Sequence, residues 1–400
     1  MGTLDTKGQE LDYARTRLQQ LGLQTLLVDV GVMGEPLVAA DVTREEVAAA
    51  AGIELARLVA EGDRGEAVET MARGAAEVAA RLHADGRLAG IMSLCGSAGA
   101  RIAATAMRAL PLGVPKLLVS TVVGGDTRPY IGTADITMMY AVLDVSGINR
   151  ISSRIITNAA GALAGMITVE PPVAEHEERP IVAATMFGVT TPCVTRARER
   201  LERAGYEVLV FHSIGIGGDS MEALVRDGLV DAVLDVTTTE LADELAGGIC
   251  ASGPGRLDLS DTEVPRVVSL GALDMVNFGP IDSVPSRYAD RTLYQHNAAI
   301  TLMRTSAQEC AELGRTIARR INAAKGPLAV AIPRGGLSAI DAEGQPFHSP
   351  EANAALFDAL LADLRPDVEV LDLSYNINDP AFADAIADLL VGMARAQVPS

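Results

Sequence analysis

Aromatic residues are scarce in this sequence of 400 residues, and tryptophan is absent. Phe, Tyr and Trp together make up 3% of the chain, so its cores have to be built from aliphatic side chains. Such cores are typical of parallel sheets covered by alanine-rich helices. Hydrophobic residues make up 48% of the chain, which is enough for large buried cores, and the length indicates two or three domains.

Positive charge is also in short supply. The chain has 33 Lys and Arg residues against 52 Asp and Glu residues, which gives a formal net charge of −19. Proteins that wrap nucleic acid or dock on an anionic membrane need concentrated Lys and Arg. The charge therefore argues against nucleic acid and membrane partners, and favours a small molecule or another protein.

Long apolar runs and closely spaced cysteines are missing as well. No run is long enough to span a bilayer, and the first residues carry no signal-peptide core, so we expect a cytoplasmic protein. The cysteines lack any C-x-x-C spacing, so neither a disulfide framework nor a zinc site is indicated and reduced thiols are expected. They are Cys95, Cys193, Cys250 and Cys310.

What the sequence does contain is a repeated alternation of short Val, Leu and Ile runs with helical patterns. Unbroken apolar strands that alternate with helices predict the α/β class, here with doubly wound, mostly parallel sheets. The expected strands lie at 24–31, 88–96, 115–125, 181–188, 207–215, 231–239, 266–274, 328–336 and 368–376.

A Pro- and Glu-rich segment at 170–180 divides the chain and reads as a linker. The predicted domains are therefore 1–170 and 180–400, with a long helix at 144–166 before the linker. A helix at 380–396 can pack on either domain. Ligands of open α/β sheets bind beyond the carboxyl ends of the strands, so we expect the strand ends of both domains to face a common ligand crevice.

The loop Gly96-Ser97-Ala98-Gly99 is the most informative candidate site, because it joins an apolar strand to an alanine-rich helix. Glycines let the backbone approach a ligand, and the first N–H groups of a helix attract phosphate. A tight turn with close packing of the helix on the strand is the alternative. The loop lacks the G-x-G-x-x-G pattern, so a nicotinamide cofactor is not supported.

Residues 2–8, Gly-Thr-Leu-Asp-Thr-Lys-Gly, are a second candidate phosphate site. Lys7 offers a positive charge, Thr6 a hydroxyl and Asp5 a ligand for magnesium. The spacing does not match the P-loop pattern, and an N-capping turn with a solvated lysine is the alternative. A helix is expected at 9–21. Because no strand precedes the turn, we expect the first strand of the sheet to be missing.

The turns that follow the strands of the second domain are rich in Gly, Thr and acidic residues, which predicts a second polar or anionic ligand site. Glu240, Asp274 and His212 are the candidates for a catalytic base. The candidate ligand-binding residues are Gly188, Thr190, Thr191, Gly217, Gly218, Thr237, Thr238 and Thr239.

Four side chains are open to two interpretations. Cys193 follows Pro192 in an expected first helical turn, where a thiol has a lowered pKa, or it simply packs. His212, and His296 at the expected start of a helix, are general bases or hydrogen-bonded structural histidines. Arg304 is expected on the same long helix, where it either clamps an anion or is a solvated or domain-bridging group.

Taken together, these turns are similar to the motifs of the Tm-one-like ATP-binding domain family. The resemblance implies a two-domain α/β protein that binds ATP, with magnesium, and forms homodimers. It also implies a separate barrel-type enzyme as a partner, since a barrel domain follows in the plant member. The family pattern starts with a strand before GTLDTKG, which agrees with the missing strand. The matching segments are GTLDTKG, GSAGA, PKLLVST, DVSGINRISSRIITNAAGALAGM, TMFGVTTPCV, GYEVLVFH, GIGGDSME, LDVTTTELAD, GALDMVNFG, HNAAITLMRTS and FHSPEANAAL.

Three functions are compatible with the sequence. The first is an enzyme that uses ATP to activate a small carboxylate or to phosphorylate a metabolite, with Glu240, Asp274 or His212 as its base. The second is a nucleotide-sensing module, in which ATP closes the two domains for recognition by a partner protein. The third is an ATP-independent hydrolase or lyase that acts on a small oxo-acid.

Overall fold

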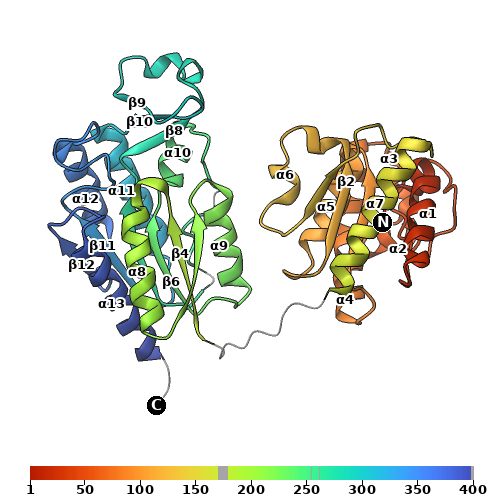
Figure 1. Cartoon of the computed structure of the whole chain (residues 1–400), viewed down its shortest axis with the longest axis horizontal. Coiled ribbons are helices and arrows are strands. Elements are labelled where there is room, and N and C mark those ends of the chain that lie inside the picture. The colour runs from red at the N-terminus through yellow and green to blue at the C-terminus, as the bar shows by residue number, and fades with distance from the viewer. Residues whose placement is uncertain (170–178, 254, 261, 398–400) are drawn as a thin grey trace. The chain divides into compact units, whose positions relative to one another are not determined.

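The chain divides into two compact units, Met1–Val173 (unit 1) and Ala174–Ser400 (unit 2) (Figure 1). The computed structural model describes residues 1–169, 179–253, 255–260 and 262–397. Each unit is built on a parallel sheet, so the predicted α/β class is confirmed. Residues 170–178 of the predicted linker lie outside the described residues.

Unit 1 has a sheet in which β1 (Ile91–Cys95), β2 (Lys116–Ser120) and β3 (Thr137–Tyr140) pair in parallel in this order. A short 3₁₀ helix, η1 (Thr121–Gly124), follows β2. The helices of this unit are α1 (Leu4–Gln20), α2 (Arg44–Ala50), α3 (Leu55–Glu61), α4 (Arg64–Ala84), α5 (Ser97–Arg108), α6 (Arg128–Ile131) and α7 (Arg150–Thr168).

The first two residues of the chain lie beside β1. The Gly2 N–H donates to the Val28 carbonyl at 3.1 Å, and the Val30 N–H donates to the Gly2 carbonyl at 3.0 Å. On the other side, the Met1 amino group donates to the Met92 carbonyl at 3.0 Å. The three-stranded sheet is therefore extended beside β1 by single bridges and hydrogen bonds, first to Met1 and Gly2 and then to residues 28–30, so that the segments lie in the order second, first, third, fourth, fifth of their sequence in the chain. Doubly wound sheets of this order bind ligands between the first and third strands, where the topology switches.

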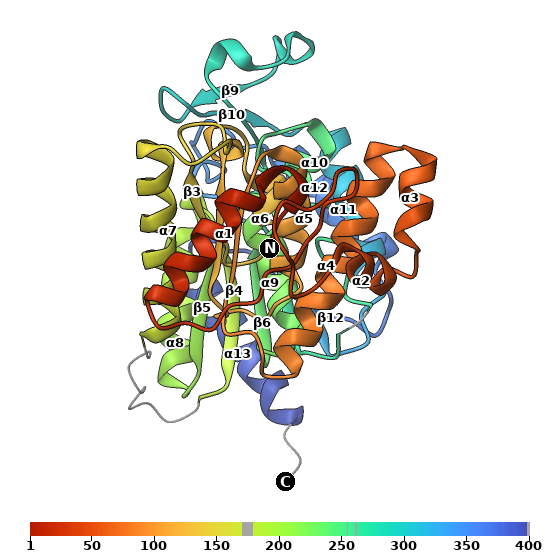
Figure 2. The same cartoon turned by 90° about the vertical axis from the view of Figure 1, so that its right-hand side faces the viewer.

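The helices of unit 1 cover both faces of this sheet (Figures 1 and 2). Met92 and Leu94 of β1 pack in the same cluster as α1 and α7, whereas Ile91 and Cys95 pack with α2, α4 and α5. The turn after Gly2 thus leads into a helix on one face, and the turn after β1 leads into a helix on the other. The space between these two turns is the switch point of unit 1.

Unit 2 has a larger sheet and a smaller antiparallel one. Its helices are α8 (Thr191–Arg203), α9 (Ile216–Arg226), α10 (Glu240–Ala246), α11 (Ala307–Ile321), α12 (Pro350–Asp363) and α13 (Pro380–Gln397), and its 3₁₀ helices are η2 (Gly188–Thr190), η3 (Ile281–Ser283) and η4 (Ser286–Tyr288). Its strands are β4 (Ile181–Met186), β5 (Glu207–His212), β6 (Ala232–Thr237), β7 (Arg266–Gly271), β8 (Met275–Phe278), β9 (Leu293–Gln295), β10 (Thr301–Arg304), β11 (Leu328–Pro333) and β12 (Glu369–Leu373).

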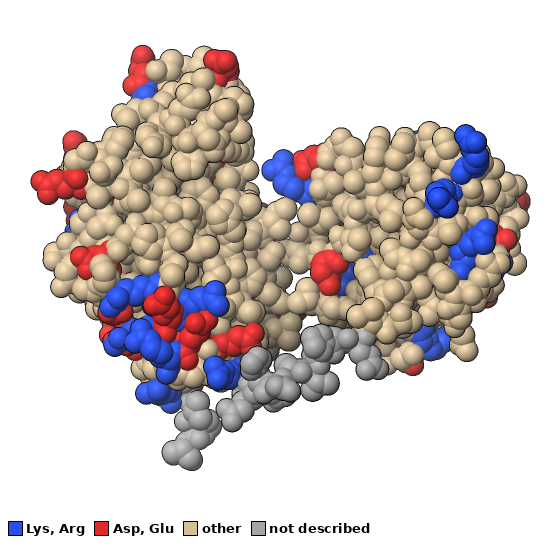
Figure 3. All heavy atoms as spheres, viewed as in Figure 1, with Lys and Arg blue, Asp and Glu red and all other residues tan. Residues whose placement is uncertain are grey.

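The larger sheet of unit 2 is all parallel, in the order β12-β11-β7-β6-β4-β5, so its switch point lies between β4 and β6. The helix at the carboxyl end, α13, packs with α8 on one face of this sheet. Ion pairs of Arg196 with Asp384 and of Arg200 with Asp388 join the two helices, and Figure 3 shows charged side chains gathered over them. The predicted C-terminal helix therefore belongs to unit 2.

Three local expectations are wrong. The helix predicted from residue 9 begins at Leu4, so most of the Gly2–Gly8 turn is its first turn, with Lys7 in a non-helical conformation (φ −124°, ψ 17°). The long helix predicted from residue 144 begins at Arg150, because the Asn149 side chain caps it. The stretch expected as a strand at 24–31 forms only isolated bridges to Gly2 and Val42.

The segment at 296–304 is also not a helix. β9 and β10 form an antiparallel hairpin, and His296 lies in its turn, where the Asn297 side chain accepts from the Ala299 N–H at 2.8 Å. The small sheet β8-β10-β9 lies at one end of unit 2 (Figures 1 and 2). Within the described residues, no helix is both long enough and apolar enough to cross a membrane.

Candidate functional site

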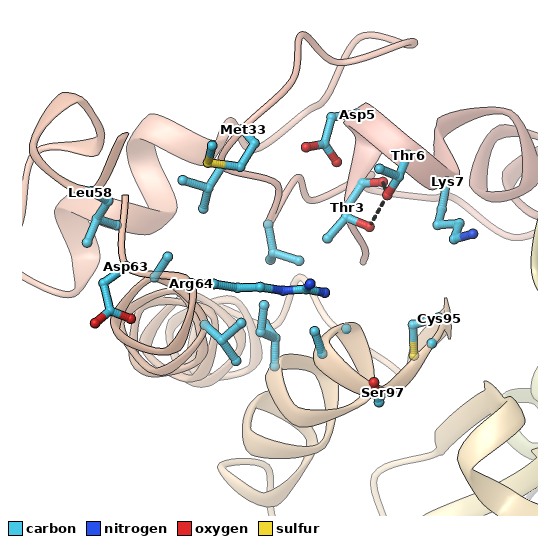
Figure 4. A pocket seen from close by; sticks show the side chains of 18 of the residues that line it. Thr3, Asp5, Thr6, Lys7, Met33, Leu58, Asp63, Arg64, Cys95 and Ser97 are labelled. Carbon is cyan, nitrogen blue, oxygen red and sulfur yellow. Dashed lines mark hydrogen bonds between the residues drawn. The ribbon is translucent and has the colours of Figure 1, made fainter. Parts of the chain in front are cut away.

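A pocket of about 510 Å³ lies at the switch point of unit 1 (Figure 4). Its walls come from the turn Thr3–Lys7, the loop Cys95–Gly99 after β1, and the segment 58–68 that ends α3 and begins α4. The first two walls are the ones that the sequence singled out, at opposite ends of the first 100 residues. The topology of the sheet brings them together.

The amino end of α5 supplies backbone donors to this pocket. Gly96 is the N-cap residue and has no side chain to cap the helix, and the Ala100 N–H returns to the Gly96 carbonyl at 2.8 Å. For the N–H groups of Ser97, Ala98 and Gly99, the described residues provide no acceptor. Unpaired first-turn N–H groups bind anions well, because the helix dipole adds to their own polarity.

The two glycines of this loop have different roles. A Cβ on Gly99 would lie 2.7 Å from the Cβ of Cys95, so this glycine permits close packing of α5 on β1. A Cβ on Gly96 would meet no atom within 4 Å, and the φ angle of Gly96 is −87°, which any residue adopts. Packing therefore explains Gly99, and neither packing nor backbone strain explains a glycine at 96.

Gly96→Ala and Gly99→Ala are expected to separate binding from stability. Gly96→Ala adds a methyl group to the pocket lining, so it should lower affinity for a phosphate ligand about 10-fold and change the unfolding free energy by less than about 1 kcal/mol. Gly99→Ala should destabilise the protein by about 1–3 kcal/mol, because Cys95 blocks the new methyl group. Urea unfolding and ligand titration of both variants check this. Equal stability losses in the two variants would contradict it.

Two cations line the pocket, Lys7 from α1 and Arg64 from α4. Figure 4 shows the Arg64 side chain extending across the pocket, whereas the Lys7 side chain points away from Arg64. Neither side chain forms a hydrogen bond or an ion pair with the described residues. The backbone of the turn is partly satisfied internally, since the Leu4 N–H donates to Asp29 Oδ1 at 3.0 Å and the Lys7 N–H to the Thr3 carbonyl at 2.8 Å. The two positive charges are therefore unpaired within the described residues, whereas most backbone groups of the turn already have hydrogen-bond partners.

Asp5, the predicted magnesium ligand, lies on the same wall. Its Oδ2 accepts from the Gly34 N–H at 3.1 Å, and its Oδ1 is buried without a hydrogen-bond partner in the described residues. Those residues contain no group of three or more His, Cys, Asp and Glu side chains placed to hold a metal. A magnesium ion at Asp5 would take its other ligands from phosphate oxygens and water, as Mg²⁺ commonly does.

The other end of the pocket is apolar. It is lined by aliphatic side chains, with Asp63 at its edge (Figure 4). Asp63 Oδ1 caps α4 by accepting from the N–H groups of Gly65 at 2.8 Å and Glu66 at 3.1 Å. The aliphatic residues are Val30, Val32, Met33, Leu58, Val68 and Ile102. A flat, weakly polar group such as a nucleobase fits such a surface.

Cys95 forms part of the pocket wall beneath the loop. The residue is buried, and burial raises the pKa of its thiol to about 11. The thiol is therefore protonated at neutral pH and packs as a small apolar group. Cys193 in the first turn of α8 behaves in the same way, because burial raises the pKa of its thiol to about 12. The sequence suggested that the helix terminus would lower the pKa of the Cys193 thiol. The opposite effect of burial is larger.

At the switch point of unit 2, the predicted threonines are turned inward. Thr190 Oγ1 and Thr237 Oγ1 hydrogen-bond each other at 2.8 Å across the gap between β4 and β6. Thr238 Oγ1 donates to the Ser269 carbonyl at 3.2 Å, and Thr191 Oγ1 donates to the Phe187 carbonyl at 3.1 Å. Thr190, Thr237, Thr238 and Thr239 are fully buried, whereas Gly188 is exposed. The hydroxyls of Thr190, Thr237 and Thr238 thus join neighbouring segments of the sheet, whereas Thr239 Oγ1 is buried without a hydrogen-bond partner in the described residues.

The amino end of α9 is occupied by a side chain of the protein. Glu240 Oε1 accepts from the N–H groups of Gly215 at 3.1 Å and Gly218 at 3.0 Å. A Cβ on Gly217 would lie 1.7 Å from the His212 carbonyl oxygen, so Gly217 is required for close packing. An internal carboxylate therefore takes the position that the glycines suggested for an external anion.

Glu240 belongs to a buried ion network centred on Arg256. The Arg256 guanidinium donates to Asp235 at 2.6 and 2.7 Å and to Glu240 Oε2 at 2.6 Å. Arg266 and Glu222 extend the network, with a distance of 2.8 Å between Arg266 Nη1 and Glu222 Oε1. Burial raises the pKa of Glu240, although Arg256 opposes this shift, whereas Asp235 has a lowered pKa because Arg256 outweighs the cost of its burial.

Asp274 lies in a second buried cluster, after β7. Its Oδ2 accepts from Ser338 Oγ at 2.8 Å, and its Oδ1 has no partner among the described residues. Burial and the neighbouring Asp341 raise the pKa of Asp274 to about 7. Arg304, on β10 rather than on a helix, donates to Asn353 Oδ1 at 2.7 Å and pairs with Asp341 at 3.4 Å. Arg304 thus holds internal groups together.

The raised pKa of Asp274 gives a pH dependence of stability. Between about pH 4 and pH 7 the folded protein holds a proton that the unfolded chain has released. The stability from this proton is full below about pH 4 and is lost as the pH rises through 7. From pH 5 to pH 8, wild type should lose about 2 kcal/mol of unfolding free energy relative to Asp274→Asn. Urea unfolding at both pH values measures this, and a pH-independent difference would be the contrary result.

The histidines are placed differently from the carboxylates. His212, at the end of β5, is exposed, and its ring stacks on Phe187 with centroids 5.5 Å apart. His296 is exposed in the β9–β10 turn. The three candidate bases therefore differ in accessibility, since Glu240 and Asp274 are fully buried and His212 is not. All three belong to unit 2, and the pocket described above belongs to unit 1.

Both halves of the chain match a known protein family. Residues 1–172 match the N-terminal domain of the uncharacterised protein family UPF0261, and residues 179–394 match its C-terminal domain. The chain belongs to UPF0261. The two matches together cover most of both units.

UPF0261 relatives occur in bacteria and in tomato. A UPF0261 protein of Clostridium tetani is 49% identical over 395 residues, which are 98% of each chain. One from Rhizobium meliloti is 44% identical over 388 residues, 96% of each chain. The ToMV resistance protein Tm-1(GCR237) of Solanum lycopersicum is 41% identical over 334 residues, which are 81% of this chain and 44% of the tomato protein. The resemblance inferred from the motifs is thus confirmed.

Sequence reasoning missed part of this UPF0261 pocket. Asp63 and Arg64 lie in the turn Gly62-Asp-Arg-Gly65 between α3 and α4. These glycines do not follow an apolar strand, so the pattern of strand and glycine-rich turn did not mark them. One signal was available, because Asp63 followed by Gly65 and Glu66 is typical of a helix N-cap. Helix starts at the carboxyl edge of a sheet are where phosphate ligands bind.

Proposed function

We propose that unit 1 binds a nucleotide by its phosphates and that this nucleotide is ATP. The observation that carries the proposal is the set of N–H groups at Ser97, Ala98 and Gly99, which have no acceptor in the described residues and belong to residues that line the pocket at the amino end of α5. Glycine at position 96, which packing and backbone geometry do not require, keeps the approach to these groups open. A phosphate accepts from several such groups at once.

Charge and shape support a nucleotide over a bare anion. Lys7 and Arg64 add positive charge at the polar end, in a protein whose net charge is −19. The aliphatic end offers a surface for a base, and Asp63 is placed beside it. The volume of about 510 Å³ lies within the range of small-molecule sites, about 300–1,000 Å³. ATP, which the resemblance implies, has phosphates for the positively charged end, a base for the aliphatic end and the size of a small molecule.

Magnesium fits this proposal through Asp5. The unpartnered Oδ1 of Asp5 is a hard oxygen ligand on the wall that also carries Lys7. When bound, a magnesium ion would neutralise phosphate charge, with phosphate oxygens and water as its other ligands. We therefore propose that ATP binds as its magnesium complex.

Within this pocket, we propose binding and sensing rather than rapid turnover. The carboxylates of the lining, Asp5 and Asp63, already accept backbone N–H groups, and the lining residues described include no histidine. The ATP-dependent enzyme with a base from Glu240, Asp274 or His212, and the ATP-independent hydrolase or lyase, stay predictions. So do the crevice between the domains, the homodimer, the barrel-type partner and the cytoplasmic location.

Calorimetric titration of the whole chain with ATP, with and without magnesium, tests the proposal. We expect binding of one ATP per chain, weaker binding without magnesium, and competition by ADP and pyrophosphate but not by adenosine at equal concentration. Release of ADP over hours, not seconds, is expected in the absence of other ligands. Binding of adenosine as tightly as ATP would refute phosphate recognition, and no ATP binding at millimolar concentration would refute the proposal as a whole.

A further inference from the structure

One apolar side chain of the pocket lining lies outside the core. Met33 lines the aliphatic end of the pocket and is 75% exposed, the largest exposed fraction among the large apolar side chains of the described residues. Its neighbour Val32 packs against the core of unit 1, whereas Met33 belongs to no apolar cluster of those residues. Single exposed apolar side chains are common on protein surfaces, so it is the pocket beside Met33 that gives this residue a candidate role.

The other side of the aliphatic end is part of the core. Val30, Leu58 and Ile102 line the pocket and are at most 3% exposed. Figure 4 shows Met33 and Arg64 on opposite sides of the pocket. A flat ring that lies on the buried side chains has one face covered, and its second face is left to water. Met33 is the exposed apolar side chain of the lining that is available to cover this second face.

The backbone around Met33 is held at few points. Residues 33–37 are exposed and form no helix or strand. In the described residues the N–H groups of Val32, Met33 and Glu35 have no hydrogen-bond acceptor, and Pro36 has no N–H to donate. A segment with few buried contacts and few internal hydrogen bonds shifts locally at little cost in free energy.

One anchor of this segment is shared with the wall that carries Lys7. Asp5 Oδ2 accepts from the Gly34 N–H at 3.1 Å, and Arg44 donates to the Gly34 carbonyl. Asp5 and Lys7 both line the pocket from the first two turns of α1. A ligand that fills both ends of the pocket therefore meets Met33 at one end and the anchor of its segment at the other.

We propose that Met33 covers the nucleobase, and that the segment 31–37 brings it into place when the nucleotide binds. This inference rests on nucleotide binding by unit 1. The thioether of methionine is polarizable and makes favourable contacts with aromatic rings, and its unbranched side chain adapts to the shape of the ring. Met33 thus contributes affinity for the base, while the N–H groups at the amino end of α5 recognise the phosphates.

The absence of tryptophan from the chain makes this closure measurable. Met33→Trp supplies a single tryptophan in the pocket lining, and Leu112→Trp is the matched control, because Leu112 is 57% exposed and lies outside the lining, beyond the carboxyl end of α5. Saturating ATP should lower acrylamide quenching of Met33→Trp at least about 3-fold and leave that of Leu112→Trp unchanged. Inorganic tripolyphosphate has no base, so it should protect neither variant.

Affinities separate a contact with the base from a structural role. Met33→Ala should weaken ATP binding about 10-fold but tripolyphosphate binding less than about 2-fold, because only the apolar contact is lost. Met33→Leu should bind ATP within about 3-fold of wild type, since it keeps an apolar side chain of similar volume. Leu112→Ala should change neither affinity. Equal losses for ATP and tripolyphosphate in Met33→Ala would assign Met33 a structural role and overturn the proposal.

The failure of this inference is distinguishable from failure of the proposed function. If ATP binds to Met33→Trp and quenching stays as strong as without ATP, Met33 does not cover the base, while phosphate recognition stands. If wild type binds neither ATP nor tripolyphosphate at millimolar concentration, the proposed function is refuted and this inference with it.

Discussion

Replacement of both Lys7 and Arg64 by methionine is expected to weaken ATP binding about 100-fold. Each cation would make a charge-assisted hydrogen bond to phosphate, and each such bond contributes about 1.5–3 kcal/mol, or roughly 10-fold or more in affinity. Neither side chain has a hydrogen bond or ion pair to lose within the described residues. The fold should therefore be unaffected, and the whole change should be in affinity.

Matched controls are available on the same helix and in the other unit. Arg73 lies on α4 and hydrogen-bonds to Thr70 at 3.0 Å, outside the pocket lining, and Lys325 is exposed in unit 2. The double variant Arg73→Met with Lys325→Met removes the same net charge. It should bind ATP within about 2-fold of wild type at 0.15 M salt, because charges beyond a Debye length of about 8 Å are screened. An equal loss in the two double variants would mean that net charge, not contact, carries the effect.

Replacement of Arg256 by methionine is expected to destabilise unit 2 by about 3–5 kcal/mol. Arg256 is fully buried and neutralises Asp235 and Glu240, so its removal leaves Glu240 without a counter-charge and Asp235 with only Arg266, whose Nη1 lies 3.7 Å from Asp235 Oδ2. It also frees Glu240, which holds the Gly215–Gly218 turn. Urea unfolding followed by circular dichroism measures the loss.

Arg200→Met provides the comparison for this variant. Arg200 pairs with Asp388 on the exposed surface of α8 and α13, where an ion pair contributes about 1 kcal/mol at most. If Arg256→Met lowered the free energy of unfolding no more than Arg200→Met does, the network around Arg256 would not stabilise unit 2. ATP binding by unit 1 should be unchanged in both variants, since neither arginine lines its pocket.

The parts of the structure that sequence could predict are those with a local signal. The apolar runs predict β1, β2 and the parallel strands of unit 2, because a buried parallel strand has to be apolar on both faces. The loop Gly96–Gly99 is marked by its glycines and by the alanine-rich α5 that follows. Lys7 lies in the first turn, and topology alone brings it to the same pocket.

The residues that sequence could not assign depend on burial and on distant neighbours. Thr190 and Thr237 read as ligand hydroxyls, yet each satisfies the other, and the sequence does not record which way a hydroxyl faces. Glu240 looks like a catalytic base in the sequence, because no local pattern shows that Arg256, 16 residues later, pairs with it. Arg64 does not follow an apolar strand, and its place in the pocket lining follows from the packing of α4 with α5.

The account rests on phosphate recognition at the amino end of α5, and a crystal structure of the whole chain with ATP and magnesium tests it most directly. We predict phosphate oxygens within hydrogen-bond distance of the N–H groups of Ser97, Ala98 and Gly99, with Lys7 and Arg64 turned toward them and the base against Leu58 and Val68. ATP bound elsewhere, or with its phosphates away from these N–H groups, would contradict the account.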